Sequence, residues 1–270
     1  MQAVLDGEVD VSYGGLGPVL RLASEGEPVR IIVSMARALA QNLVTREGIT
    51  SLDQLRGVSW ALDGFGALSH HMARLVVRAL EIGEDEIDWQ AVGPPPERIE
   101  RLLAGSIDVS LIRVEEAAAL NSDAGNGLHT LLGFAELKDL VPVQPHGVLA
   151  TTEAYERAHQ DELHRLTRGM IRASRALNDD FDNFRKVYDR NVTVKIADQE
   201  VHDIWRKERD SGGFAVNGEV TKGHWQDQMQ LFYALHPDLA KISPGEVIAE
   251  DFVAQALEDL GVQPGGDEPG

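Results

Sequence analysis

The sequence of 270 residues contains no cysteine. It therefore excludes disulfides, zinc–thiolate sites and a cysteine nucleophile. The sequence also lacks an apolar run of about 18 residues, the length that a membrane-spanning helix needs. A basic segment followed by an apolar one, which marks a secretion signal, is missing too. We therefore expect no membrane span and no export signal in this sequence.

Basic residues are few: 25 Lys and Arg stand against 44 Asp and Glu, for a formal net charge of −19. A field of this sign repels nucleic acid and anionic membrane surfaces, so we expect neither as a partner. The acidity favours a solvated, self-repelling exterior. Nucleotide-binding and hydrolase signatures are also missing, since no GxxxxGK[ST], GxGxxG, GxSxG or HExxH pattern occurs.

One phrase of the sequence occurs twice. Leu5–Ser12 and Leu103–Ser110 share a leucine, a glycine, an aliphatic residue and the order Asp-Val-Ser at the same positions. In the first copy, a glycine that would end a helix precedes Val9 and Val11, which alternate as in a strand. The repetition predicts one helix–strand unit in each of two lobes. Because the chain opens on the tail of a helix, we expect a preceding strand and helix to be missing from it.

Strands alternate with helices through the first 150 residues, which predicts parallel sheets with crossover connections. Gly26 and Gly57 are placed to end helices, and Thr50 or Ser51 to begin one. Beyond Thr152 the chain becomes helical, and the aromatic residues there are expected in the core. The expected strands cover 9–13, 29–33, 42–45, 58–62, 88–92, 107–112 and 146–152. The expected helices cover 15–26, 49–57, 69–82, 94–105, 161–178, 181–188, 198–209, 224–235 and 249–260.

The order of these motifs resembles the type II periplasmic binding fold from about Val4 to Thr152. The phrases LxGxxDVS, GITSLDQLRGVSWAL, GFGALSHHMARLVVRAL and RLLAGSIDVSLIRVEEA are similar to the solute-binding proteins for sulfonates, taurine, nitrate and thiamine precursors. The resemblance implies an α/β chain with parallel-rich sheets and a helical C-terminal part. It assigns residues 1–43 and 146–260 to lobe 1 and residues 44–145 to lobe 2, with a disordered tail at 261–270.

The resemblance to these solute-binding proteins also implies a function for this chain, which we state as an expectation. It implies two crossing strands near 42–45 and 146–152, and a small organic, anionic molecule caught by closure of the lobes. The expected partner is the membrane permease of an ABC-type importer, and the expected location is periplasmic or extracytoplasmic. No cofactor and no metal are implied.

Two turns before helices are candidate ligand contacts, because helix N-termini and the ends of strands favour anions. In the first turn, Gly14 and Gly15 would let backbone amides approach an anionic group, and Tyr13 could stack or donate its hydroxyl. An ordinary turn is the alternative. At the end of the strand over 29–33, Ser34 is a weaker candidate.

The second turn contains Phe65, Gly66, Ser69 and His70. Ser69 is placed to cap the helix that follows. In the sulfonate and taurine binders a Ser or Thr followed by His opens the matching helix, so the resemblance carries a ligand role over to Ser69. His70 and the next residue, His71, either contact the ligand or face solvent. No Glu or Cys at ligand spacing supports a metal at the two histidines.

Arg113 follows the second copy of the repeated strand and could pair with a sulfonate or carboxylate. The alternative, a salt bridge to Glu115 or Glu116, is equally compatible with the sequence. The rival function is an enzyme of the same fold, a decarboxylase or dehydratase, in which His70 or His71 would transfer protons and Arg113 would hold the substrate. A desulfinase would need the missing cysteine. A ligand-sensing regulator is a third alternative.

Overall fold

The computed structural model describes residues 1–35, 40–122, 126–141, 147–218 and 222–264. Contacts divide the chain into unit 1 (Met1–Ala38, Pro145–Phe184 and Gly212–Gly270) and unit 2 (Leu39–Gln144 and Arg185–Ser211). The sequence assigned Arg185–Ser211 to lobe 1, whereas it belongs to unit 2 because helix α10 (Asp198–Asp210) packs on α5 (Val114–Ser122). The last six residues of the predicted tail and residue 146 of the predicted last strand lie outside the described residues.

Unit 1 is built around a three-stranded sheet in the order β1-β8-β2. Strand β8 (Gly147–Thr152) lies between β1 (Ser12–Gly15) and β2 (Val29–Ser34) and is antiparallel to both. The parallel pairing expected from the sequence is therefore wrong for this sheet, because β8 lies between β1 and β2 and pairs antiparallel with each of them. The predicted strand over 9–13 begins later than expected, since Val9 lies outside β1 and is 46% exposed.

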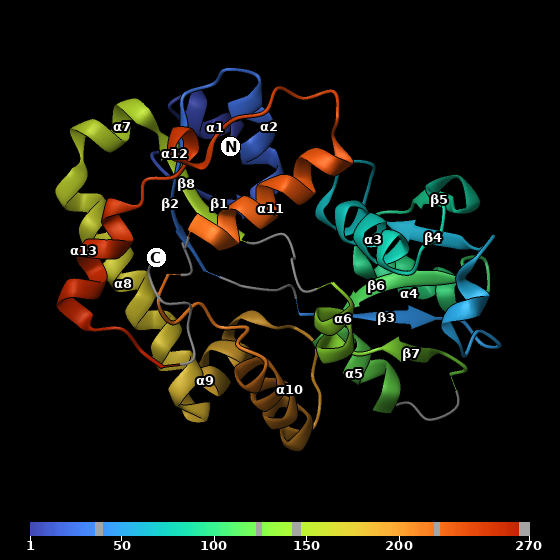
Figure 1. Cartoon of the computed structure of the whole chain (residues 1–270). Helices are drawn as coiled ribbons and strands as arrows, with labels where there is room; N and C mark the ends of the chain where they lie inside the picture. The colour runs from blue at the N-terminus through green and yellow to red at the C-terminus, as the bar shows by residue number, and fades with distance from the viewer. Residues whose placement is uncertain (36–39, 123–125, 142–146, 219–221, 265–270) are drawn as a thin grey trace. The chain divides into compact units, whose positions relative to one another are not determined.

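Helices cover both faces of this sheet. Val148 and Ala150 of β8 pack with α2 (Leu16–Ser24) and α11 (Lys222–Leu235), whereas Leu149 packs with α8 (Gln160–Asp179) and α13 (Asp251–Leu260). This alternation is the period of two that a strand buried on both faces requires. In Figure 1, α8 and α13 run side by side, as their contacts also show. The aromatic residues predicted for the core are confirmed as buried. Trp225, Phe232 and Tyr233 of α11 pack on this sheet, Trp205 of α10 lies in unit 2, and all four are less than 7% exposed.

Unit 2 contains a five-stranded sheet in the order β5-β4-β6-β3-β7, which Figure 1 shows. Strand β4 (Ser59–Leu62) is parallel to β5 (Asp88–Ala91) and to β6 (Val109–Arg113). Strand β3 (Gln41–Thr45) is antiparallel to β6 and to β7 (His129–Leu132). Parallel pairing is thus present in β5-β4-β6, and the antiparallel exceptions in the two units are β3 and β8, the strands that the resemblance identifies as crossings.

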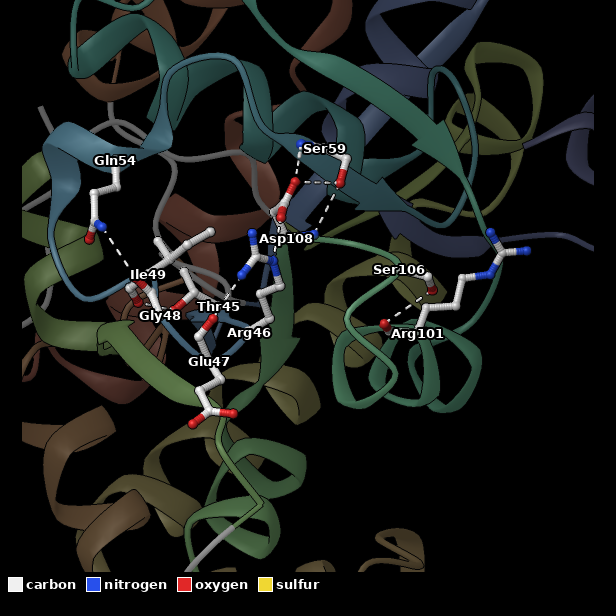
Figure 2. A network of polar contacts seen from close by, with 10 residues as sticks. All are labelled: Thr45, Arg46, Glu47, Gly48, Ile49, Gln54, Ser59, Arg101, Ser106 and Asp108. Carbon is white, nitrogen blue, oxygen red and sulfur yellow. Dashed lines mark hydrogen bonds and ion pairs between the residues drawn. The ribbon is translucent and has the colours of Figure 1, made fainter.

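A polar network joins the ends of the three inner strands of this sheet, β3, β4 and β6 (Figure 2). Asp108, just before β6, accepts hydrogen bonds from the backbone N–H and the hydroxyl of Ser59 on β4, each at 2.8 Å. Its other oxygen pairs with Arg46 Nε, just after β3, at 2.5 Å. Burial acts to raise the pKa of Asp108, but these hydrogen bonds outweigh it and lower the pKa from its usual value.

The two copies of the repeated phrase adopt the same local structure in different units. In α1 (Gln2–Leu5), Gly7 N–H donates to Val4 O and Glu8 N–H to Ala3 O. At the end of α4 (Pro95–Leu103), Gly105 and Ser106 make the corresponding bonds to Leu102 and Arg101. Both glycines have a positive φ, +72° and +66°, which only glycine adopts without strain. The predicted repetition is confirmed, and β1 and β6 lie in separate sheets.

The remaining elements complete the two units. Ser51 caps the short 3-10 helix η1, as one of the two predicted residues, through a capping box with Gln54.

No helix among the described residues has the length and apolar character that crossing a membrane would require. The elements not yet named are η1 (Leu52–Leu55), α3 (Leu68–Ala79), η2 (Glu84–Glu86), α6 (Phe134–Leu140), α7 (Glu153–Ala158), α9 (Phe181–Asn191) and α12 (Pro244–Val247).

Candidate ligand-binding site

The turn between β4 and α3 in unit 2 brings together four of the residues singled out from the sequence. Helix α3 begins at Leu68, and Ala67 is its N-cap, in an extended conformation with φ −68° and ψ 166°. The N-cap has no side chain that accepts from the first turn, and no acidic residue lies in that turn. The first amides of α3 are therefore available to an anion.

Ser69 does not cap α3, so that prediction is wrong. The helix starts one residue earlier than expected, after Gly66, whose φ of +79° turns the chain into the helix. Ser69 is 1% exposed, and its hydroxyl accepts the Asp63 N–H at 2.9 Å, which fixes the end of β4 to the helix. Its contact with a ligand remains a prediction.

His70 is held as a neutral hydrogen-bond donor. Its Nδ1 accepts the Gly66 N–H at 3.0 Å, so the ring proton resides on Nε2. Burial lowers the pKa of His70 and the charge of Arg74 lowers it further, while Glu84 acts in the opposite direction. The ring makes edge contacts with Phe65 and Trp89, each at a centroid distance of 5.5 Å. Phe65 itself is 66% exposed.

A buried arginine that the sequence analysis did not select lies beneath this turn. Arg98 on α4 is 2% exposed, and its Nη2 pairs with Asp63 at 2.9 Å. Its Nη1 donates to Ser110 Oγ at 3.1 Å and to Leu111 O at 2.7 Å, both on β6. Burial lowers the pKa of Arg98, and Asp63 raises it. The signal for this residue was its spacing from Leu102, which puts both on the inward face of α4.

Arg113 forms the salt bridges that the sequence left open as an alternative. Its Nη2 lies 2.7 Å from Glu116 Oε1, and its Nε lies 3.4 Å from Glu115 Oε1. The hydrogen bond that Arg113 donates to Glu116 raises the pKa of Arg113, and burial raises the pKa of Glu115. The side chain of Arg113 remains 56% exposed, and its pairing with a ligand anion stays a prediction.

The junction of β1 and α2 in unit 1 repeats the order of residues found before α3. The predicted turn is wrong, because Tyr13, Gly14 and Gly15 belong to β1 and pair with β8, and α2 begins at the next residue. Tyr13-Gly14-Gly15-Leu16 corresponds to Phe65-Gly66-Ala67-Leu68: an aromatic residue, a glycine, a small N-cap and the first helical leucine. Gly15 is extended like Ala67 and makes no side-chain cap, and the first turn of α2 has no acid. Tyr13 is 58% exposed, and desolvation raises the pKa of its hydroxyl.

Ser34 is fully buried at the end of β2 in the same unit. Its hydroxyl donates to Gly147 O at 3.4 Å, and its backbone N–H donates to Gly218 O. Gly147 also lies under the Tyr13 ring, where a Cβ atom would collide with the hydroxyl. The unit 1 candidates therefore meet around Gly147. In unit 2, Phe65, Gly66, Ser69 and His70 lie at the start of α3, whereas Arg113 lies at the end of β6. No three His, Asp or Glu side chains within the described ranges are grouped to hold a metal ion.

The comparisons with known proteins identify the fold. No family model and no curated protein sequence matches the chain. Among solved structures, a putative periplasmic sulfonate-binding protein of an ABC transporter from Methylobacillus flagellatus KT matches with a TM-score of 0.73 and 14% identity, over 100% of this chain and 80% of that one. A protein from Bordetella bronchiseptica RB50 matches with a TM-score of 0.72 and 17% identity, over 97% and 84%.

An enzyme also has this architecture. The desulfurization enzyme DszB matches with a TM-score of 0.62 and 13% identity, over 93% of this chain and 85% of that one. At identities this low, the structural similarity shows the fold alone. The function has to be argued from the residues of the site. The chain has the mixed α/β fold of periplasmic binding proteins, as the sequence predicted.

Proposed function

We propose that this protein is the solute-binding component of an ABC-type importer and binds a small organic anion, such as a sulfonate or carboxylate. The observation that carries the proposal is that the first turns of α2 and α3 contain no Asp or Glu. It is supported by the fold, which is also that of a sulfonate-binding protein. The proposed partner is the membrane permease of the importer, and the proposed location is extracytoplasmic.

The two N-termini differ from most others in this acidic chain. Asp or Glu occupies the first turn of α4, α5, α8, α9, α10 and α13, where it complements the helix dipole. The first turns of α2 and α3 lack such an acid, as does that of α11, which begins at Lys222. In a protein with 44 acidic residues, amides left without a carboxylate favour an anion from solution.

Neutral His70 adds a directed donor beside α3. Because Nδ1 is occupied by the Gly66 N–H, Nε2–H is the free donor of the ring. A proton-transfer role would require the ring to accept a proton near neutral pH, and the lowered pKa of His70 opposes this. These features favour binding over the rival decarboxylase or dehydratase reaction.

The test places a charge where the ligand anion would lie. Ala67→Asp puts a carboxylate at the N-cap of α3, and Ala67→Asn puts a neutral amide of the same shape there. Both residues cap helices well, so the two variants are expected to fold equally. We expect Ala67→Asp to bind alkanesulfonates or alkanecarboxylates roughly 10- to 150-fold more weakly than Ala67→Asn, the value of one hydrogen bond to a charged group.

The measurement is isothermal titration calorimetry of the full chain with sulfonates, carboxylates and uncharged isosteres. Circular dichroism checks that both variants retain their helices. Equal affinity of the two variants for an anion would exclude the N-terminus of α3 as its site. Binding of the uncharged isosteres alone would contradict the proposal that the ligand is an anion.

A further inference from the structure

Unit 2 contains a cavity of about 320 Å³ enclosed by β3, β7, α5, α6 and α10. Every residue that lines it belongs to unit 2. Its size lies at the lower end of the range for small-molecule sites. None of the ligand contacts considered above lines this cavity.

The cavity combines apolar walls with negative charge. Val114 and Ala118 of α5, Phe134 of α6 and Ile204 of α10 form the apolar surface. Four carboxylates also line it, those of Glu136, Glu200, Asp203 and Glu208, against the single ammonium of Lys207. An occupant with an aliphatic body and a positive charge matches both features.

Two of the carboxylates are already satisfied by the protein. Glu200 accepts the Ala197 N–H at 2.9 Å, and Asp203 accepts from Gln199 at 3.2 Å and from Arg206 at 3.1 Å. The carboxyls of Glu136 and Glu208 make no hydrogen bond or ion pair with any residue in the described part of the chain, and Lys207 forms no ion pair there either. Glu136 is exposed to water, whereas Glu208 is half-buried.

The environment of Glu208 explains why this group needs a cation. Burial, with a smaller contribution from Glu115 on α5, raises the pKa of Glu208 to about 7. A half-buried carboxylate that faces other acids and accepts from no described donor is destabilised in its charged form. A ligand ammonium would supply both the missing hydrogen bonds and the missing charge.

We propose that this cavity is a second binding site, separate from the anion site, that takes a small aliphatic ammonium ion, with Glu208 as its counter-ion and Val114, Ala118, Phe134 and Ile204 around its carbon chain. The site needs no change in the fold and no residue of unit 1. Its ligand class follows from the lining: a neutral molecule would leave Glu208 unpaired, and an anion would meet four carboxylates.

The probe is n-butylammonium, titrated into the full chain by calorimetry, with 1-butanol as the uncharged isostere and butyrate as the anion. At pH 8 we expect one butylammonium bound per chain, at least about tenfold more tightly than butanol. Affinity should fall by about tenfold from pH 8 to pH 6 as Glu208 becomes protonated. The other charged groups at the cavity are Glu115, Glu136, Glu200, Asp203 and Lys207.

Two test variants and one control variant keep the proposal falsifiable. Glu208→Gln should weaken butylammonium binding at least tenfold, whereas Asp198→Asn, which removes the same charge from the exposed start of α10, should leave it unchanged. Ala118→Leu fills the cavity without altering its charge and should also abolish binding. The proposal is overturned if butanol binds as well as butylammonium, if Glu208→Gln binds like the unmodified protein, or if an alkanesulfonate competes for the same site.

Discussion

Glu208 makes the stability of the molecule depend on pH. Its pKa is about 7 in the folded protein, against an ordinary value of 4.5, so the folded state binds the proton more tightly than the unfolded chain does. The free energy of unfolding should therefore fall as pH rises from about 4.5 through 7, by on the order of 3 kcal/mol for the full shift. Glu208→Gln cannot lose a proton and should remove this part of the slope.

Urea unfolding of both proteins between pH 5 and 8 measures the effect. Glu208→Gln is expected to be the more stable protein at pH 8 and close to the unmodified one at pH 5. Parallel stability curves over this range would show that the carboxyl of Glu208 is solvated in the folded protein. Asp198→Asn again serves as the control for the lost charge.

At the scale of elements, the network around Asp108 should carry more stability than its counterpart in the repeat. Asp108 joins β3, β4 and β6 through Arg46 and Ser59 (Figure 2), whereas Asp10, at the matching position of the first copy, is exposed and its carboxyl accepts no hydrogen bond from a described residue. Asp108→Asn replaces one carboxylate oxygen, an acceptor, by an amide NH2 group, which is a donor. The amide then faces the donors of Arg46 or Ser59. We expect a loss of about 1–3 kcal/mol.

Asp10→Asn is the matched control and should change the free energy of unfolding by less than about 0.5 kcal/mol. Because the pKa of Asp108 is lowered in the folded state, its contribution is present above the ordinary pKa of 3.8 and is lost as pH falls below it. The difference between the two variants in urea unfolding should thus be full at pH 7 and shrink toward pH 3. Equal effects of the two substitutions at pH 7 would contradict the role of the network.

Elements were predictable where a local signal marked both ends. Gly26 and Gly57 end their elements as expected, and α3 follows from the apolar spacing of its residues. Strand β7 and helices α5, α6 and α7 were missed because they are short or, in the case of α5, lack a clear apolar face. The antiparallel β3 and β8 could not be predicted from alternation alone, since pairing depends on contacts far apart in the sequence.

The candidate site shows the same division between local and distant signals. The residues that precede α2 and those that precede α3 are each contiguous in sequence, and both groups were selected from it, although Tyr13, Gly14 and Gly15 lie in β1 and not in the predicted turn. Arg98 and Glu208 were not selected from the sequence, because the partners of each are distant in sequence and are brought near by the fold. Arg98 pairs with Asp63, and Glu208 lines the cavity near Glu115. The cap assigned to Ser69 failed because its hydroxyl accepts the Asp63 N–H instead of an amide of the first turn.

At the scale of the whole molecule, the net charge of −19 should make stability increase with salt. Repulsion among excess carboxylates acts over a Debye length that falls from about 30 Å at 0.01 M salt to about 8 Å at 0.15 M. Surface ion pairs such as Arg168–Asp259 weaken over the same range, but each contributes only about 0–1 kcal/mol. We expect screening of the repulsion to prevail.

Thermal unfolding in 10 and 150 mM NaCl at pH 7.5 measures this balance. Relief of about 1 kcal/mol of repulsion would raise Tm by roughly 2–4 °C in a chain of this size. The control is the same pair of measurements near pH 4.8, the isoelectric point of the sequence, where positive and negative charges balance and the rise in Tm should vanish. A Tm that falls with salt at pH 7.5 would show that attraction within the ion pairs exceeds the repulsion of the excess carboxylates, and that the acidic surface is stabilised by its local partners.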